Sequence, residues 1–275
     1  VEKQLQQNGF KGEELAVIKA LVLGQRNDIS KELLQEYTNA GAIHILAVSG
    51  LHVGIILFIL TSLFKPLENL KNGKLLKTVL IICLLWFFAL IAGCFASVIR
   101  AVSLFPVLAI GMTFHLKSFV LHLIITSMFV LLLIKPLFLF DVGFQLSYVA
   151  VLGIVWVQPK LFSIWNPKSI FLDKLWQLIT VSIAAQLGVL PLSLFYFHQF
   201  PSLFLISNVV IIPFLGIILV CGIVIIILSA VSLLPKFIAD GYGFVISSLN
   251  RFVQIIANQE SFLVKDISFS LAMLI

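Results

Sequence analysis

The side chains that could do chemistry in this chain are few, and they interrupt long apolar stretches. Ser49 and His52 are three residues apart, so they share one face of a helix. A hydroxyl beside an imidazole suits nucleophilic hydrolysis, but two positions on one helix seldom align these groups for proton transfer, and no oxyanion donor is evident. We therefore favour a polar lining over an intramembrane hydrolase.

Small residues four apart let two helices approach closely. The pattern occurs at Gly50/Gly54, Gly143/Ser147 and Ala184/Gly188. Gln145 and Gln186 lie midway between the last two pairs and point away from the small face. Lipid is a costly environment for such groups. We expect His52, Gln145 and Gln186 to line one shared polar cavity; alternatively, each bonds a backbone carbonyl of a further helix.

Arg100 is the most costly residue in the apolar part of the chain. Ser97, Arg100 and Ser103 follow one another at steps of three and form a polar stripe. An arginine in a membrane span must be paired or hydrated, and its planar fork of donors suits phosphate. The alternative is a helix-end arginine that extends to the interface. We predict that Ser97, Arg100 and Asn208 belong to the same polar path as Ser49 and His52.

Metal chemistry is not indicated. His115 and His122 are seven residues apart, which separates them by about 10 Å along a helix. No tight histidine and carboxylate motif occurs. The three cysteines, Cys83, Cys94 and Cys221, are expected to be small buried apolar residues. No cofactor is expected.

The composition of the chain identifies the solvent of its helices. Of its 275 residues, 61% are hydrophobic and only 11% are charged. In soluble domains about 45–50% of the residues are apolar and about 25% are charged. A single hydrophobic core could not bury so many apolar residues, so lipid must cover the rest of the apolar surface. The fold class expected is all-α, a polytopic transmembrane helical bundle. The net charge of +6 is first explained by cytoplasmic loops.

Apolar segments of about 20 residues predict about eight or nine spans. They lie at 43–64, 78–95, 97–114, 118–134, 143–158, 177–197, 203–232, 237–257 and from about 262 to the end. The third contains Arg100 and Pro106. The seventh is too long for one upright helix, and Pro213 and Gly216 could kink it or divide it into a re-entrant pair.

Residues 1–42 form an amphipathic lead-in. A helical period runs from 13 to about 38, broken at 24–28, and Ser30 can cap the second helix. These helices are expected at the membrane surface, outside the cytoplasm, although their apolar stripe could pack on the bundle. Lysine-rich loops at 65–77 and 160–174 predict the cytoplasmic side. Because both ends look cut, 43–275 is interpreted as the membrane domain of a longer protein.

Four segments together resemble a known family. The segment HILAVSGLHVG at 44–54 resembles the signature of the ComEC-type competence proteins, which carry DNA across the inner bacterial membrane. Three further segments are similar, in the same order: ASVIRA at 96–101, GFQLSYVAVLGI at 143–154 and AAQLGVLPLSLFYFHQFPSLFLISNVVIIP at 184–213. Ala96 departs from the family, which usually has proline there. The resemblance covers roughly residues 15 to 235.

The resemblance implies a multi-pass channel of the bacterial inner membrane that conducts single-stranded DNA during natural transformation. It implies an oligonucleotide-binding domain and a nuclease domain elsewhere in the full-length protein, so this chain is not expected to be an enzyme. The partners implied are a DNA receptor and, because no P-loop occurs here, a separate cytoplasmic motor; a homo-oligomer is compatible. The alternative function is a transporter of a small or lipid-linked solute, bound at a broken 203–232 segment.

Overall fold

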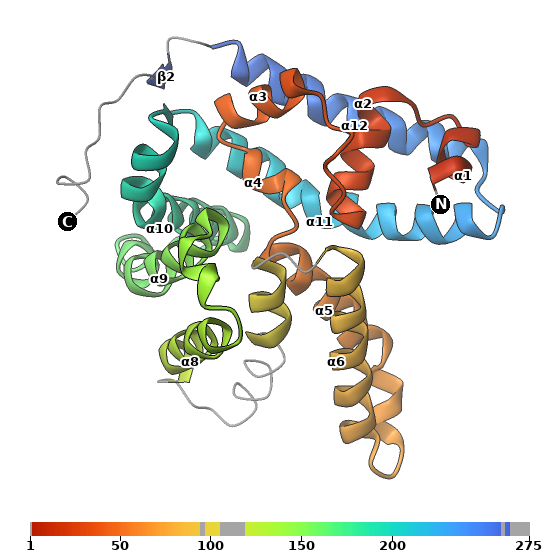
Figure 1. Ribbon diagram of the computed structural model, residues 1–275, viewed down its shortest axis with the longest axis horizontal. Helices are drawn as coiled ribbons and strands as arrows, with labels where there is room; N and C mark the ends of the chain where they lie inside the picture. The colour runs from red at the N-terminus through yellow and green to blue at the C-terminus, as the bar shows by residue number, and fades with distance from the viewer. Residues whose placement is uncertain (1, 94–96, 105–118, 260–261, 265–275) are drawn as a thin grey trace.

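The computed structural model describes residues 2–93, 97–104, 119–259 and 262–264 (Figure 1). Their regular structure is helical except for one antiparallel pair of short strands, β1 (Phe200–Pro201) and β2 (Leu263–Val264), and turns connect the helices. The expected all-α class is therefore confirmed for the described part of the chain. Ala96, Pro106, Cys94 and His115 lie outside the described residues, as do 105–114 of the third expected span and nearly all of the last.

The helices follow one another with short connections. The N-terminal part contains α1 (Glu2–Gln7), α2 (Gly12–Ile18), a π-helical turn η1 (Lys19–Leu23), α3 (Lys31–Asn39) and α4 (Ile43–Leu46). The central part contains α5 (Gly50–Leu63), a 3-10 turn η2 (Lys65–Asn69), α6 (Gly73–Ile91), a short helix at 97–104, α8 (Phe119–Ile134) and η3 (Pro136–Phe140). The last part contains α9 (Val142–Phe162), α10 (Ile170–Phe197), α11 (Phe204–Ala230) and α12 (Lys236–Ala257).

Four of the described helices, α6, α9, α10 and α11, are long and apolar enough to cross a membrane. Only 17% to 33% of the residues in their apolar stretches are buried, so most of this surface is left for lipid. The helices α5 and α8 are apolar but shorter. The described residues thus identify a membrane protein, with fewer candidate spans than the eight or nine expected.

Two expected spans differ from what the structure shows. The segment 203–232 is one continuous helix, α11, which runs through Pro213, so it is not divided into a re-entrant pair. Proline is tolerated in membrane helices, where neighbouring groups satisfy the freed carbonyl. The segment 237–257 forms α12, which is not among the four membrane-crossing candidates. It buries one face and carries charged residues on the other.

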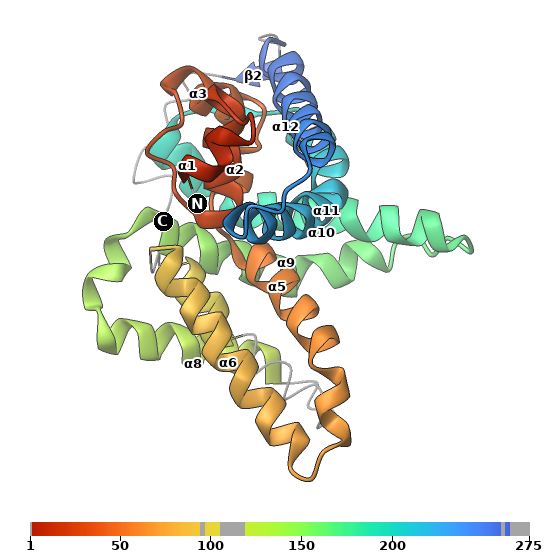
Figure 2. The same ribbon diagram turned by 90° about the vertical axis from the view of Figure 1, so that its right-hand side faces the viewer.

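The helices run in three directions rather than in one parallel bundle. Helices α11 and α12 lie with the N-terminal helices in one layer, while α5 and α6 extend away from it (Figure 1). The α9–α10 hairpin is seen end-on in Figure 1 and lengthwise in Figure 2, where it projects from the rest of the molecule. The crossing angles do not follow from the sequence, because hydrophobic length fixes the extent of a helix but not the angle at which it crosses another.

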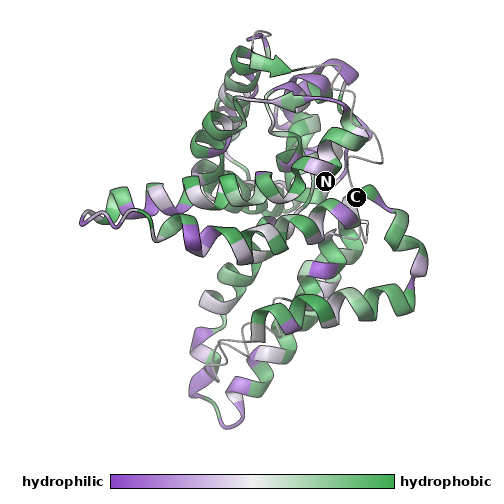
Figure 3. Cartoon of the chain, turned by 90° about the vertical axis from the view of Figure 1, so that its left-hand side faces the viewer, coloured by the Kyte–Doolittle hydropathy of each residue, from purple (hydrophilic) through white to green (hydrophobic). Residues whose placement is uncertain are grey.

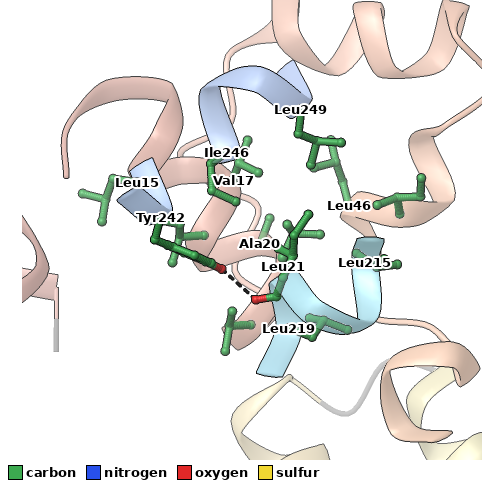
Figure 4. Packing of buried hydrophobic residues seen from close by; sticks show 14 of the residues in the cluster. Leu15, Val17, Ala20, Leu21, Leu46, Leu215, Leu219, Tyr242, Ile246 and Leu249 are labelled. Carbon is green, nitrogen blue, oxygen red and sulfur yellow. Dashed lines mark hydrogen bonds between the residues drawn. The ribbon is translucent and has the colours of Figure 1, made fainter. Parts of the chain in front are cut away.

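The largest hydrophobic core joins the N-terminal helices to α11 and α12. Val17, Ile18 and Leu21 are at most 1% exposed and pack with Leu219 and Ile246 (Figure 4). The Tyr242 hydroxyl donates a hydrogen bond to the Ile218 carbonyl oxygen at 3.0 Å, which links α12 to α11. The apolar stripe of the N-terminal helices therefore packs on the rest of the molecule.

Local signals in the N-terminal part are confirmed. Ser30 caps α3, because its side chain accepts a hydrogen bond from the Leu33 backbone N–H at 3.1 Å. The preceding helical stretch ends at Gly24, whose φ of 74° is the left-handed conformation that glycine favours. On α3, Tyr37 is buried and its hydroxyl donates to Asn250 Oδ1 at 2.9 Å. Burial raises the pKa of Tyr37, so the phenol stays neutral as a donor.

The cysteines do not follow their expected burial. Cys83 and Cys221 are exposed and unpaired. They lie on α6 and α11, two of the four candidate spans, so their surroundings are apolar even though no protein covers them. In these helices an apolar sequence environment indicates lipid rather than a protein core.

The closest approach of two membrane helices is between α9 and α10. A Cβ atom added at Gly188 would lie 2.7 Å from the Val149 carbonyl oxygen, and one at Gly153 would lie 2.7 Å from the Ala184 carbonyl oxygen. Gly188 thus meets Gly153 rather than Gly143 or Ser147. Gly143 is exposed near the start of α9, and Ser147, Gly50 and Gly54 are half-buried.

We predict that Gly188→Ala destabilises the protein by about 1–3 kcal/mol, because the added methyl group forces α9 and α10 apart. The measurement is the thermal unfolding midpoint in detergent. Gly241→Ala on α12 is the matched control: nothing lies within 4 Å of its added Cβ atom, and alanine is the better helix former. Equal midpoints for the two variants would contradict the close contact between α9 and α10.

Candidate functional site

Ser49 and His52 form the N-terminal cap of α5. Ser49 precedes the helix in an extended conformation, and its backbone N–H donates to His52 Nδ1 at 3.3 Å. Its hydroxyl lies 3.1 Å from the same nitrogen. Ser49 was expected to share a helix face with His52; it lies just outside the helix, so their contact is that of an N-terminal cap. With Nδ1 accepting the backbone bond, the ring proton of neutral His52 is on Nε2.

The described residues orient the His52 imidazole through one nitrogen only. A catalytic imidazole is oriented by a third group on its second nitrogen. His52 is 1% exposed, and its Nε2 has no hydrogen-bond partner among the described residues. A buried donor without a partner is unfavourable by about 1–3 kcal/mol, so this nitrogen is a candidate contact for a ligand or water.

Ser97 joins the short helix at 97–104 to this cap. Its hydroxyl donates to the Val48 carbonyl oxygen at 3.0 Å, one residue before Ser49. Val48, Val53 and Val98 belong to one buried cluster, which holds the segments in place. The first and second motif segments, far apart along the chain, thus meet at the start of α5.

Arg100 is buried one turn beyond Ser97. It is 7% exposed, and its guanidinium carbon lies 5.3 Å from the centre of the Tyr148 ring on α9. Its Nε has no hydrogen-bond partner, and within the described part of the chain no carboxylate pairs with it. The side chain therefore does not extend to a surface. A cation–π contact holds the charge without neutralising it.

Tyr148 and Ser127 were not selected from the sequence. The Tyr148 hydroxyl and the Ser127 hydroxyl are 3.0 Å apart, which connects α9 to α8 behind the guanidinium. The Tyr148 ring also contacts Phe144, with the ring centres 4.6 Å apart and the planes tilted by 48°. One signal could have found Tyr148: it follows Gln145 by three residues, so it shares a helix face with a residue that was selected.

Gln145, Gln186 and Asn208 lie at separate places. Gln145 is half-buried; its Nε2 donates to the Leu139 carbonyl oxygen at 2.7 Å, and its Oε1 accepts from the Tyr196 hydroxyl at 2.8 Å. Gln186 is half-buried on α10. Asn208 is 8% exposed on α11, and its Oδ1 has no partner among the described residues.

The contacts described above connect four of the selected residues in two groups. Ser49, His52 and Ser97 meet at the start of α5. Arg100 lies with Tyr148 and Ser127, which the sequence did not single out, and the 97–104 helix contributes to both groups. Two cavities, of about 400 and 690 Å³, lie instead among the N-terminal helices and α12, and none of the selected residues lines either. No group of three metal-ligating side chains occurs in the described ranges.

We predict that Tyr148→Leu destabilises the protein more than Tyr148→Phe. The leucine variant removes the cation–π contact, which contributes about 0.5–2 kcal/mol, whereas phenylalanine removes only the hydrogen bond to Ser127, about 1 kcal/mol. Unfolding of both variants is measured in detergent, with and without Arg100→Met. A leucine effect that is unchanged by Arg100→Met would show that the ring and the guanidinium are not coupled.

Comparison with known proteins agrees with the motif segments. The family model described as competence protein matches residues 21–275. The chain is 32% identical over 251 residues to ComE operon protein 3 of Bacillus subtilis (strain 168), covering 90% of this chain and 31% of that protein. It thus spans about a third of the relative's length. No solved structure matches. On the extent of the family match, with Ser49, His52, Ser97 and Arg100 inside it, the chain belongs to the competence protein family.

Proposed function

We propose that this chain is a membrane passage for single-stranded DNA during DNA uptake in the bacterial inner membrane. One observation carries the proposal: Arg100 is buried with an unpaired Nε, over an aromatic ring and without a carboxylate partner in the described part of the chain. A phosphate offers the charge and the acceptors that this guanidinium lacks. The names of the family and of its relative, competence protein and ComE operon protein 3, support a role in DNA uptake.

The surroundings of Arg100 suit a strand that must keep moving. Each phosphate carries a charge that cannot enter hydrocarbon unpaired, yet a passage that binds too tightly does not conduct. The Ser49–His52 cap, linked to Arg100 through the 97–104 helix, adds an unpaired Nε2 donor. The guanidinium of Arg26 lies within electrostatic reach of His52 and adds positive charge on this side.

The transporter alternative has no observation in its favour. It needed a discontinuous helix whose broken ends bind the solute, and the segment that suggested one is the continuous helix α11. On the proposed function, the strand is delivered by a DNA receptor and pulled by a motor on the cytoplasmic side. Nuclease activity then belongs to a part of the full-length protein outside this chain.

We predict that Arg100→Ala and His52→Ala each reduce uptake of labelled DNA by about 10–100-fold, since a hydrogen bond to a charged group contributes about 1.5–3 kcal/mol. The variants are introduced into the full-length protein in competent cells, and uptake is normalised to the amount in the membrane. Arg100→Lys keeps the charge without the planar fork, so we expect an intermediate defect.

The control is Arg251→Ala. Arg251 is an exposed arginine on α12, away from both groups of selected residues, so uptake should remain normal. Normal uptake in both Arg100→Ala and His52→Ala, at normal membrane levels, would refute the proposed passage. A defect of the same size in Arg251→Ala would show that loss of any cation impairs uptake.

A further inference from the structure

The end of the α9–α10 hairpin, residues 160–174, exposes apolar side chains where a turn in water would be polar. We refer to these residues as the hairpin tip. Ile164 is 73% exposed, Ile170 81% and Phe171 75%. The hairpin projects from the rest of the molecule (Figure 2), so no other helix covers the tip. An apolar surface on a projecting turn indicates a binding partner or a membrane.

Tryptophans concentrate around this tip. Three of the four tryptophans of the chain, Trp156, Trp165 and Trp176, belong to the hairpin or its connection. The Trp176 Nε1–H donates to the Phe162 carbonyl oxygen at 3.1 Å and its ring meets Trp165 edge-on at 5.5 Å, which holds the connection against α10. Trp165 itself remains 48% exposed. Tryptophan is enriched where the bilayer meets water, because its ring is apolar and its N–H is polar.

The charge of the tip complements an anionic surface. Lys160, Lys168 and Lys174 are all exposed, and Asp173 is the one carboxylate among residues 160–174. Figure 3 shows hydrophilic and hydrophobic residues next to one another along this end of the hairpin. Lysines at a membrane surface are attracted to anionic headgroups, while their apolar stems lie against the acyl region.

The tip joining α5 and α6 provides an internal comparison. It also carries four lysines, Lys65, Lys71, Lys74 and Lys77. There, Lys77 Nζ pairs with Glu68 Oε1 at 2.6 Å, and no tryptophan occurs between 65 and 77. That tip also exposes aliphatic side chains, since Leu70 is 59% exposed and Leu75 68%. The α9–α10 tip differs from it by its aromatic residues, Trp165 and Phe171, so lysines and aliphatic residues alone do not describe it.

We propose that the hairpin tip is an interfacial anchor that binds anionic phospholipid, with Ile164, Ile170 and Phe171 entering the membrane below a ring of lysines. DNA is the other polyanion that the lysines could contact, and its bases could stack on Trp165. Lipid fits better, because the most exposed residues are aliphatic or a phenyl ring and DNA offers no alkyl chains to cover them. The inference does not depend on the proposed function.

The test measures the environment of Trp165 in the full-length protein reconstituted into vesicles. Its emission is obtained as the difference between the native protein and Trp165→Phe. With lipids brominated near the headgroup, we expect strong quenching and a blue-shifted spectrum in vesicles containing phosphatidylglycerol. We expect weaker quenching in phosphatidylcholine vesicles. Lys160→Gln/Lys168→Gln/Lys174→Gln should abolish this difference between the two lipids.

The matched control is Lys65→Gln/Lys71→Gln/Lys74→Gln at the other tip, which should leave the lipid dependence of Trp165 unchanged. Quenching of Trp165 by aqueous iodide and not by brominated lipid would overturn the proposal. A loss of the lipid dependence in the control triple variant would also overturn it, because the effect would then reflect net charge. If single-stranded DNA shields Trp165 from iodide more than anionic lipid does, the tip is a DNA contact instead.

Discussion

The constraint on which this structure depends is a guanidinium buried in an apolar protein, with no carboxylate partner among the described residues. Arg100 is 7% exposed and is held over the Tyr148 ring, while the chain around it is 61% hydrophobic. The apolar interior strengthens every electrostatic interaction of this charge. The groups that hold it, from the 97–104 helix, α8 and α9, must therefore keep one arrangement. Ser97, Ser127 and Tyr148 provide it through hydrogen bonds at 3.0 Å.

The extents of the helices could be predicted from the sequence because apolar length is a one-dimensional property. The segment 78–95 corresponds to α6, and 177–197 corresponds to α10, which begins earlier, at Ile170. Its first turns contain Asp173 and Lys174, which made them look like a loop although they are helical. The segment 237–257 is a helix with one charged face, so its identity as a helix was predictable and its role as a span was not.

The packing could not be predicted because it depends on which surfaces meet. Four small-residue positions were proposed on α9 and α10, yet the contact forms between Gly188 and Gly153, and Gly153 has no small neighbour four residues away. From the sequence, the apolar stripe of the N-terminal helices could face lipid or pack on the other helices. Val17 and Leu21 are buried against α11 and α12, so the stripe packs on protein. Among the site residues, the Ser49–His52 contact was missed because a cap position obeys different geometry from a helix interior.

The choice of an aromatic partner for Arg100 has a consequence for how a strand could pass. A buried ion pair with a carboxylate loses about 3–5 kcal/mol when one partner is removed, so each arriving phosphate would have to displace a strong competitor. A cation–π contact contributes about 0.5–2 kcal/mol. A phosphate can therefore displace the ring from the guanidinium, and the contact with the ring forms again when the phosphate leaves. Tyr148 therefore holds the guanidinium in place between phosphates without trapping it. On the proposed function, the aromatic partner that Arg100 has in the described part of the chain keeps its charge inside the protein and still permits repeated, reversible contact with a polyanion.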